Sequence, residues 1–549
     1  MRSAKRALAL AAATALVLTA CGGGDTDDGD TTDPEVTEDG AEDGAEDGSE
    51  DAEAASGGEF SIRGCEPQFL NTTDTRDVCG GAVLRLLFAP LVETDPETGE
   101  PSMGTAESIE SEDNQTWTIT LREGDTFHDG TPVTAQSYAD AWNAVAGPEA
   151  GNSFFFSRFE GFEELQAGEA EELSGVEVVD DQTLEVTLTE PFGPFLISLN
   201  DTSFYPLPEA YFDDPDAFQD APIGNGRYQM DGEWERNQQI ALTKFEDYSG
   251  EDPGLADAIT FVIYDDINTA YLDVQAGSLD VSDVIPPEQE GAVDGEFGEN
   301  VLRTPTSSFT YLGFPMFDER FGDNPELRQA LSLAVDREAI ISAIFSDTLR
   351  PATAIIPPVL EAYREDACEF CEFDPERAQE LFEEAGGYDG TMTMYFNSGA
   401  GHEEWVEAVA NQWNEVLGIE DVQFESLEFA QYLDLLDAEE IEGPFRLGWI
   451  LSYLSPQYAL EDLYTTDAGS NSFGYSNPEF DEALADANAT DPEEADSAYQ
   501  EAEDILLADL PLIPMWYGQS TSVWGDRVEG VIMDPSGYVR AERISVVED

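Results

Sequence analysis

Apolar and polar residues alternate in two stretches of the first third of the chain, TWTITLREG (116–124) and QTLEVTLTE (182–190). In the first stretch, Trp117, Ile119 and Leu121 are separated by polar side chains. A period of two places the apolar side chains on one face of an extended segment. Both stretches are therefore predicted to be half-buried β-strands.

Helices are predicted where Asn or Asp is followed by Pro, because the first residue caps a helix and proline suits its first turn. Four such pairs come late in the chain: Asn324-Pro325, Asp374-Pro375, Asn477-Pro478 and Asp491-Pro492. The first opens the long stretch NPELRQALSLAVDREAIISAIF, and the second opens a segment that stops at Gly386-Gly387. Early strands and late helices indicate a mixed α/β chain with more than one domain.

Length and composition agree with a folded body of this kind. The chain has 549 residues, 41% of them hydrophobic, and 31 are Phe. This is enough for two or three domains with a large core, and it excludes a chain that is disordered throughout.

Acidic residues dominate the chain, with 119 Asp and Glu against 22 Lys and Arg and a formal net charge of -97. Residues 22–58 hold 15 of the acids and no base, and three of the bases precede residue 7, so the rest of the chain carries about -85. No basic patch for a nucleic-acid backbone can form on such a surface. The charge indicates either adaptation to a salty or alkaline medium or a merely acidic secreted protein.

The amino terminus has the pattern of an export signal in residues 1–20. Three basic residues precede an apolar stretch that is too short to span a bilayer as a mature helix. The LTAC that ends it resembles a bacterial lipoprotein box, which implies cleavage that leaves Cys21 as the first residue, carrying lipid. An ordinary signal peptide with an unmodified cysteine is the alternative. Residues 21–58, rich in Gly and acid, are predicted to be a disordered tether.

Without Cys21, the exported chain has an even set of four cysteines, which is typical of disulfides. Proximity in sequence pairs Cys65 with Cys79 and Cys368 with Cys371. A redox pair or half of a metal site are the alternatives for the CEFC motif. A metal site needs more ligands, and the chain has only two histidines. No metal and no cofactor are expected.

Five longer blocks carry the most specific signal: AESIESEDNQTWTITLREGDTFHDGTPVTAQSYADAW (106–142), IGNGRYQM (223–230), NPELRQALSLAVDREAI (324–340), GYSNPEFDEAL (474–484) and LPLIPMWY (510–517). In this order, behind an export signal, the blocks resemble the extracytoplasmic solute-binding proteins of ABC importers, family 5, the peptide/nickel-type receptors.

The resemblance implies an α/β fold of the type II periplasmic-binding-protein kind, a Venus flytrap with two lobes and three subdomains (cluster C). Transferred block by block, it divides the body into residues 59–93, 205–304 and 515–549 (domain I, the first lobe), residues 94–204 (domain II, inserted) and residues 305–514 (domain III, the second lobe). The chain is expected to cross between the lobes near Thr304–Ser308 and Pro514–Gly518.

The same resemblance implies a ligand that is held between the lobes as an added strand, mainly by main-chain groups. In the oligopeptide-binding members a Gly-Trp pair lies at the cleft, and an arginine three residues before the Trp can meet the ligand carboxylate. FRLGW matches this motif with Arg446, Gly448 and Trp449. Arg446 is also the only Lys or Arg between Arg377 and Arg527. A plain salt bridge to one of many nearby acids is the alternative for this arginine.

Four more residues are candidates for the cleft. His402 stands eleven residues before a Trp, as in some oligopeptide-binding members. It is expected either to contact a ligand carboxylate or to be a solvated histidine at a helix start. Tyr311, Trp516 and Tyr517 are aromatic candidates for the walls of the cleft, with core packing as the alternative for each.

Ser452 departs from the family pattern. The family's peptide binders have an Asp three residues after the Trp, which holds the free ammonium of the ligand, and a serine hydroxyl carries no charge. Either another carboxylate substitutes here, or the ligand lacks a free amine, as in a blocked peptide, an oligosaccharide, or a nickel or other metal chelate. An oligopeptide or dipeptide is the preferred ligand.

These features predict a monomeric receptor lipoprotein outside the cytoplasm, on the outer face of the cell membrane, that delivers its ligand to a membrane permease. A secreted hydrolase is the competing class. Two histidines and no nucleophile motif give little support to Ser-His-acid or metal catalysis, so no enzymatic activity is expected.

The net charge predicts that stability depends strongly on salt. Lowering the salt concentration removes the screening between like charges, so the melting temperature is expected to fall and structure to be lost on desalting. Thermal denaturation followed by circular dichroism, from low to molar sodium chloride, measures this. A melting temperature that stays constant over the range would contradict the prediction.

Overall fold

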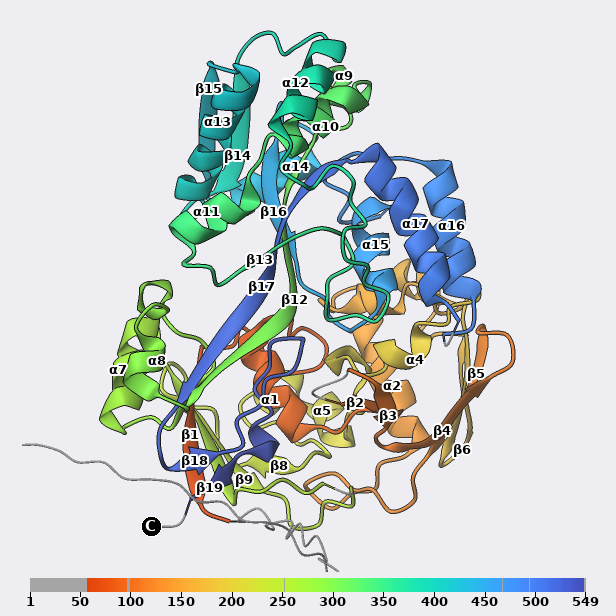
Figure 1. The fold of residues 1–549 in the computed structure, drawn as a ribbon. Coiled ribbons are helices and arrows are strands. Elements are labelled where there is room, and N and C mark those ends of the chain that lie inside the picture. The colour runs from red at the N-terminus through yellow and green to blue at the C-terminus, as the bar shows by residue number, and fades with distance from the viewer. Residues whose placement is uncertain (1–56, 96–98, 251, 467, 493, 548–549) are drawn as a thin grey trace, which may run out of the picture. The chain divides into compact units, whose positions relative to one another are not determined.

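The computed structural model describes residues 57–95, 99–250, 252–466, 468–492 and 494–547 (Figure 1). The predicted signal peptide, Cys21 and nearly all of the acidic tether lie outside the described residues. Within the described part of the chain, no helix has the length and apolar character needed to cross a membrane.

The largest sheet has eleven strands in the described residues. Its order is β15 (Val422–Leu427), β14 (Met392–Asn397), β16 (Phe445–Trp449), β12 (Val301–Gly313), β17 (Leu512–Trp524), β11 (Val281–Ser282), β1 (Glu59–Gly64), β10 (Ala258–Ile263), β9 (Gln239–Lys244) and β8 (Tyr228–Met230), with β13 (Arg350–Pro351) paired to β17. The pairs β14–β15 and β1–β10 are parallel, whereas β12 and β17 are antiparallel.

Strands β12 and β17 join the two halves of this sheet. Each is 13 residues long, and Figure 1 shows them side by side between the part that carries β14 and β16 and the part that carries β1. Their register shifts between Pro305 and Phe309, within one of the segments expected to cross between lobes. The lobe boundaries themselves stay a prediction.

A four-stranded antiparallel sheet comes from the segment that was predicted to be inserted. Its order is β4 (Ala106–Ser111), β5 (Thr116–Leu121), β7 (Thr183–Thr187) and β6 (Val176–Asp180). Strands β5 and β7 confirm the two strands predicted from alternation, because the alternating apolar side chains of both are buried. Two short hairpins complete the strands: β2 (Val92–Thr94) with β3 (Pro101–Met103), and β18 (Val528–Glu529) with β19 (Ser545–Val546).

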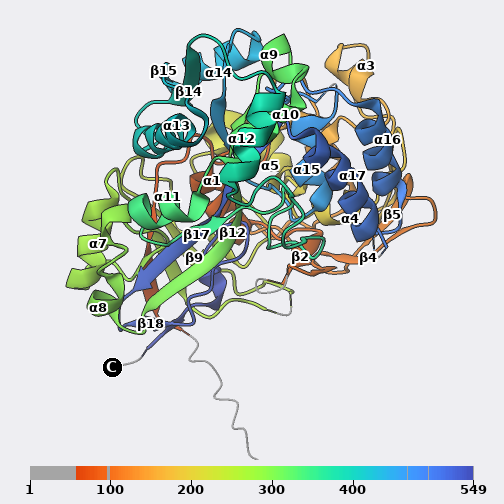
Figure 2. The same cartoon turned by 45° about the horizontal axis from the view of Figure 1, so that its top comes forward.

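Helices occur both in the first 300 residues and in the rest of the chain. Those of the first 300 residues are α1 (Val78–Leu87), α2 (Ala135–Val145), α3 (Phe162–Gln166), α4 (Phe195–Ser198), α5 (Glu209–Asp213), α6 (Pro215–Phe218), α7 (Ile267–Ala276) and α8 (Val293–Phe297). Those that follow are α9 (Glu319–Gly322), α10 (Pro325–Leu333), α11 (Arg337–Ile344), α12 (Pro375–Glu384), α13 (Glu403–Leu417), α14 (Phe429–Asp437), α15 (Pro456–Tyr464), α16 (Pro478–Ala489) and α17 (Asp496–Asp509). Figures 1 and 2 both show α15, α16 and α17 grouped together.

Three of the four predicted caps open helices. The side chains of Asn324, Asp374 and Asn477 each accept a hydrogen bond from a main-chain amide of the first turn. The prediction for Asp491-Pro492 is wrong, because the carbonyl of Asp491 accepts from the amide of Glu494 and closes a turn before α17.

The stretch that was expected to form one long helix after Asn324 forms two, α10 and α11. The break follows from a second cap: the Asp336 side chain accepts from the amide of Ala339 and starts α11 at Arg337. This cap is visible in the sequence, but the continuous apolar pattern concealed it.

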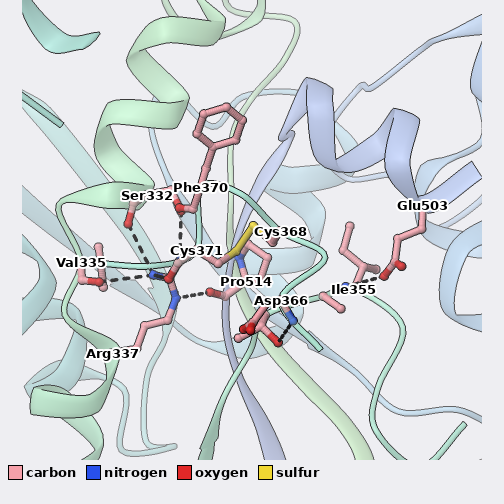
Figure 3. Close-up of a disulfide and its surroundings, with 12 residues drawn as sticks. Ser332, Val335, Arg337, Ile355, Asp366, Cys368, Phe370, Cys371, Glu503 and Pro514 are labelled. Carbon is pink, nitrogen blue, oxygen red and sulfur yellow. Dashed lines mark hydrogen bonds between the residues drawn. A yellow bond between two sulfur atoms is a disulfide. The ribbon is translucent and has the colours of Figure 1, made fainter. Parts of the chain in front are cut away.

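Both predicted disulfides are present. Cys65–Cys79 joins the segment after β1 to α1, and Cys368–Cys371 closes the CEFC loop. The CEFC disulfide lies beside Arg337, whose side chain points at main-chain carbonyls (Figure 3).

Arg337 ties three segments together. Its Nε donates to the carbonyl of Pro514 on β17 at 2.6 Å, and its Nη1 donates to the carbonyl of Cys371 at 2.7 Å. Its Nη2 donates to Ser332 Oγ on α10 at 3.0 Å. The guanidinium is buried and has no carboxylate partner among the described residues, so main-chain dipoles balance its charge.

Replacing Arg337 by Gln is expected to lower the free energy of unfolding by about 3 kcal/mol or more, since several buried carbonyls lose their donor. Arg377→Gln is the control, because this arginine pairs with Glu369 at an exposed site and should matter by about 1 kcal/mol or less. Urea denaturation of both variants measures the difference. Equal losses would contradict the role assigned to Arg337.

Candidate functional site

Strand β16 carries the FRLGW motif and has one open edge. On one side it is antiparallel to β12, with Arg446 opposite Leu312 and Trp449 opposite Phe309. On the other side, β14 is in register with β16 only at Phe445. Beyond that residue, this edge has no strand partner among the described residues. An unpaired strand edge offers main-chain donors and acceptors to an extended ligand.

The guanidinium of Arg446 is partly buried and has free hydrogen-bonding capacity. Its Nη1 donates to Asn397 Oδ1, at the end of β14, at 3.2 Å, and its buried Nε has no hydrogen-bond partner. It forms no ion pair with any carboxylate in the described residues. Burial lowers the pKa of Arg446 from its usual value. The alternative of a plain salt bridge therefore finds no partner in the described structure.

His402 shares the surroundings of Arg446. It stands at the N-cap position of α13, and its Nδ1 accepts a hydrogen bond from Trp405 Nε1 at 3.3 Å. Burial, and then the positive charge of Arg446, lower the pKa of His402 to about 4. The ring is therefore neutral at neutral pH, so His402 can offer a hydrogen bond but no charge.

Trp449 and Ser452 meet at a third residue, Tyr458 on α15. The Trp449 ring is 5.7 Å from the ring of Tyr458, and its Nε1 donates to the Tyr458 carbonyl at 3.1 Å. Ser452 Oγ donates to the Tyr458 hydroxyl at 3.0 Å. Because successive side chains alternate along a strand, Arg446 and Trp449 point to opposite faces of β16. The motif thus contributes to two separate groups of side chains.

The other three aromatic candidates lie in the core. Tyr517 is buried, and its hydroxyl bonds both the amide and the carbonyl of Ala354. Trp516 packs against Trp405, with 4.9 Å between ring centres. Tyr311 is fully buried and its hydroxyl has no hydrogen-bond partner. Contact of these residues with a ligand stays a prediction, but Trp516 packs against Trp405, which in turn contacts His402.

A cavity of about 220 Å³ lies where the end of β1 approaches the end of β16. Its lining includes Gly64 at the end of β1, Cys65 after it, Thr306 and Ser308 on β12, and Ile450 after β16. The side chain of Ile450 is 56% exposed. The ends of β1 and β16, which belong to opposite halves of the large sheet, therefore line the same cavity.

Sequence reasoning missed several groups of this site. Asn397, the partner of Arg446, is the polar residue that ends the apolar strand MTMYFN, and this position was a usable signal. The Tyr432 hydroxyl, which donates to the Arg446 carbonyl at 2.7 Å, stands in an ordinary amphipathic helix, α14, and no local signal marks it.

Comparisons with known proteins identify the family of the chain. The sequence profile of the bacterial extracellular solute-binding proteins, family 5 Middle, matches residues 100–471. The oligopeptide-binding protein OppA of Bacillus subtilis is 28% identical over 500 residues, which cover 86% of this chain and 90% of that protein.

Two solved structures have the same fold. The murein tripeptide binding protein MppA of Escherichia coli superimposes with a TM-score of 0.74 at 24% identity, covering 90% of this chain and all of that one. Haemophilus influenzae OppA in complex with RPPGFSPFR gives a TM-score of 0.71 at 26% identity, covering 89% and 99%. The chain belongs to the bacterial extracellular solute-binding proteins, family 5. The family and the α/β periplasmic-binding-protein fold predicted from the sequence are confirmed.

Substituting Arg446 by Gln is expected to raise the pKa of His402, because a nearby positive charge is removed. The pKa should stay below that of a free histidine, since burial is the larger cause of the shift. The only other histidine, His128, also has a pKa of about 4, from burial, and serves as the internal control. Proton NMR of the two rings against pH measures both values. If the pKa of His402 is the same in the variant as in the unsubstituted protein, the electrostatic effect of Arg446 on His402 is contradicted.

Proposed function

We propose that this protein is the substrate-binding component of an ABC importer and that its ligand is an oligopeptide or dipeptide. The observation that carries the proposal is the open edge of β16 beside an arginine that lacks a carboxylate partner in the described structure. An extended peptide satisfies both features, since its main chain can add to the strand edge and its carboxylate can meet the guanidinium. The names of the relatives, an oligopeptide-binding and a murein tripeptide binding protein, support the same ligand class.

Electrostatics make the pairing with Arg446 specific. The body of the chain repels anions at long range, so salt that screens the field favours the approach of an anionic group. At short range the partly buried guanidinium has at least one nitrogen without a partner and a geometry that suits a carboxylate. The neutral ring of His402 adds a hydrogen bond without adding repulsion. Arg446 therefore determines where the carboxylate of the ligand lies.

The ligand leaves the protein chemically unchanged in this proposal. We assign no catalytic residue, and a secreted hydrolase remains the competing class. A ligand without a free amine, such as an oligosaccharide or a metal chelate, is the alternative within the receptor class.

Lipid on Cys21 would hold the receptor at the outer face of the cell membrane, where a permease receives the ligand.

Arg446→Gln is expected to weaken binding of a free peptide by about 2–5 kcal/mol and to have little effect on the same peptide with an amidated carboxyl terminus. Isothermal titration calorimetry in molar salt, with mass spectrometry of the recovered peptide, measures affinity and integrity together. Arg377→Gln controls for the change in net charge. Cleaved peptide would favour the hydrolase, and equal losses for both peptides would remove Arg446 from the site.

A further inference from the structure

A second cavity, of about 320 Å³, lies between the 3-10 turn Ser153–Phe156 and α15. Eight aromatic side chains line it, among them Phe154, Phe155, Phe192 and Tyr458, together with the carboxylates of Glu461 and Asp462. Tyr458 is also the residue that contacts Trp449 and Ser452. The cavity therefore adjoins the Trp449 face of the FRLGW strand.

The two carboxylates of this cavity differ in their partners. Glu461 pairs with Arg158 and also accepts from the side-chain amides of Gln457 and Asn488. Asp462 accepts no hydrogen bond and forms no ion pair among the residues that the structure describes, and only burial and the charges of Glu461 and Arg158 act on it. Arg158 does not neutralise it fully, because this arginine already pairs with both Glu190 and Glu461. The cavity thus contains a net negative charge with one unsatisfied carboxylate.

The surroundings of Asp462 disfavour its charged form. Burial, and then the negative charge of Glu461, raise the pKa of Asp462 to about 6. Below this pKa the partly buried carboxylate takes up a proton, and at neutral pH, where it is mostly charged, a cation beside it would lower the cost of burying its charge. An inorganic cation would need several more oxygen ligands than the single free carboxylate provides. Aromatic faces around one carboxylate suit an organic ammonium group instead.

We propose that this cavity binds an alkylammonium group of the ligand, with Asp462 as its counter-charge and the aromatic rings around its carbon chain. The inference rests on the proposed peptide-binding function and specifies which peptides are preferred. A strand added at the edge of β16 projects side chains to both faces, so one ligand can reach Arg446 on one face and this cavity on the other. The ammonium can come from a free amino terminus or from a lysine side chain.

Two matched pairs of peptides separate these sources. The first pair is Ala-Ala-Ala and its N-acetyl derivative. The second is N-acetyl-Ala-Lys-Ala and N-acetyl-Ala-norleucine-Ala, which differ only in the side-chain ammonium. Calorimetry in molar salt is expected to show about tenfold tighter binding of the amine-bearing member in at least one pair. The pair that shows the preference identifies the source.

Asp462→Asn is expected to abolish this preference while leaving the melting temperature unchanged or higher, because a buried charge without a partner is removed. Asp486→Asn, the same change at an exposed position of α16, should keep the preference. Equal affinity within both pairs, or a preference that survives in Asp462→Asn, overturns the inference and leaves peptide binding intact. Failure of all four peptides to bind overturns the proposed function and the inference with it.

Discussion

The scarcity of positive charge is the constraint on which the rest of this structure depends. With 22 Lys and Arg against 119 Asp and Glu, carboxylates greatly outnumber the basic side chains that could pair with them. An arginine that has none is therefore informative. Arg337 is surrounded by main-chain carbonyls, which hold the disulfide loop and β17 together. Arg446 has a single amide partner. The contacts of Arg337 are therefore structural, whereas Arg446 keeps hydrogen-bonding capacity for a ligand.

Local patterns predicted the local structure well. Alternation identified β5 and β7, and the caps Asn324, Asp374 and Asn477 identified the starts of three helices. The errors were local as well. Asp491 closes a turn in place of a helix, and Asp336 starts a new helix inside an apolar stretch. In both cases an Asp is compatible with either a turn or a helix start, and the local pattern alone does not choose between them.

The site was predictable only where a motif carried it. The FRLGW motif predicted Arg446, and the spacing to a later Trp predicted His402. In the structure the two side chains are close enough for the charge of Arg446 to lower the pKa of His402. Asn397 was visible at a strand end. The aromatic cavity was not predictable, because Arg158 and Glu461 are 303 residues apart and no periodicity relates them. Tyr311, Trp516 and Tyr517 show the opposite difficulty, since large aromatic residues near a motif are as suitable for a core as for a cleft.

The hydrogen bonds of Arg337 also bear on how the stability of the protein responds to salt. Concentrated electrolyte weakens attraction between surface ions, so pairs such as Arg350 with Glu365 contribute little there. A guanidinium enclosed by peptide dipoles is out of reach of dissolved ions. The hydrogen bonds of Arg337 are therefore expected to persist at high salt concentration, where the repulsion between surface carboxylates is screened. A rise in ionic strength thus leaves the hydrogen bonds of Arg337 in place and weakens the repulsion between the surface carboxylates.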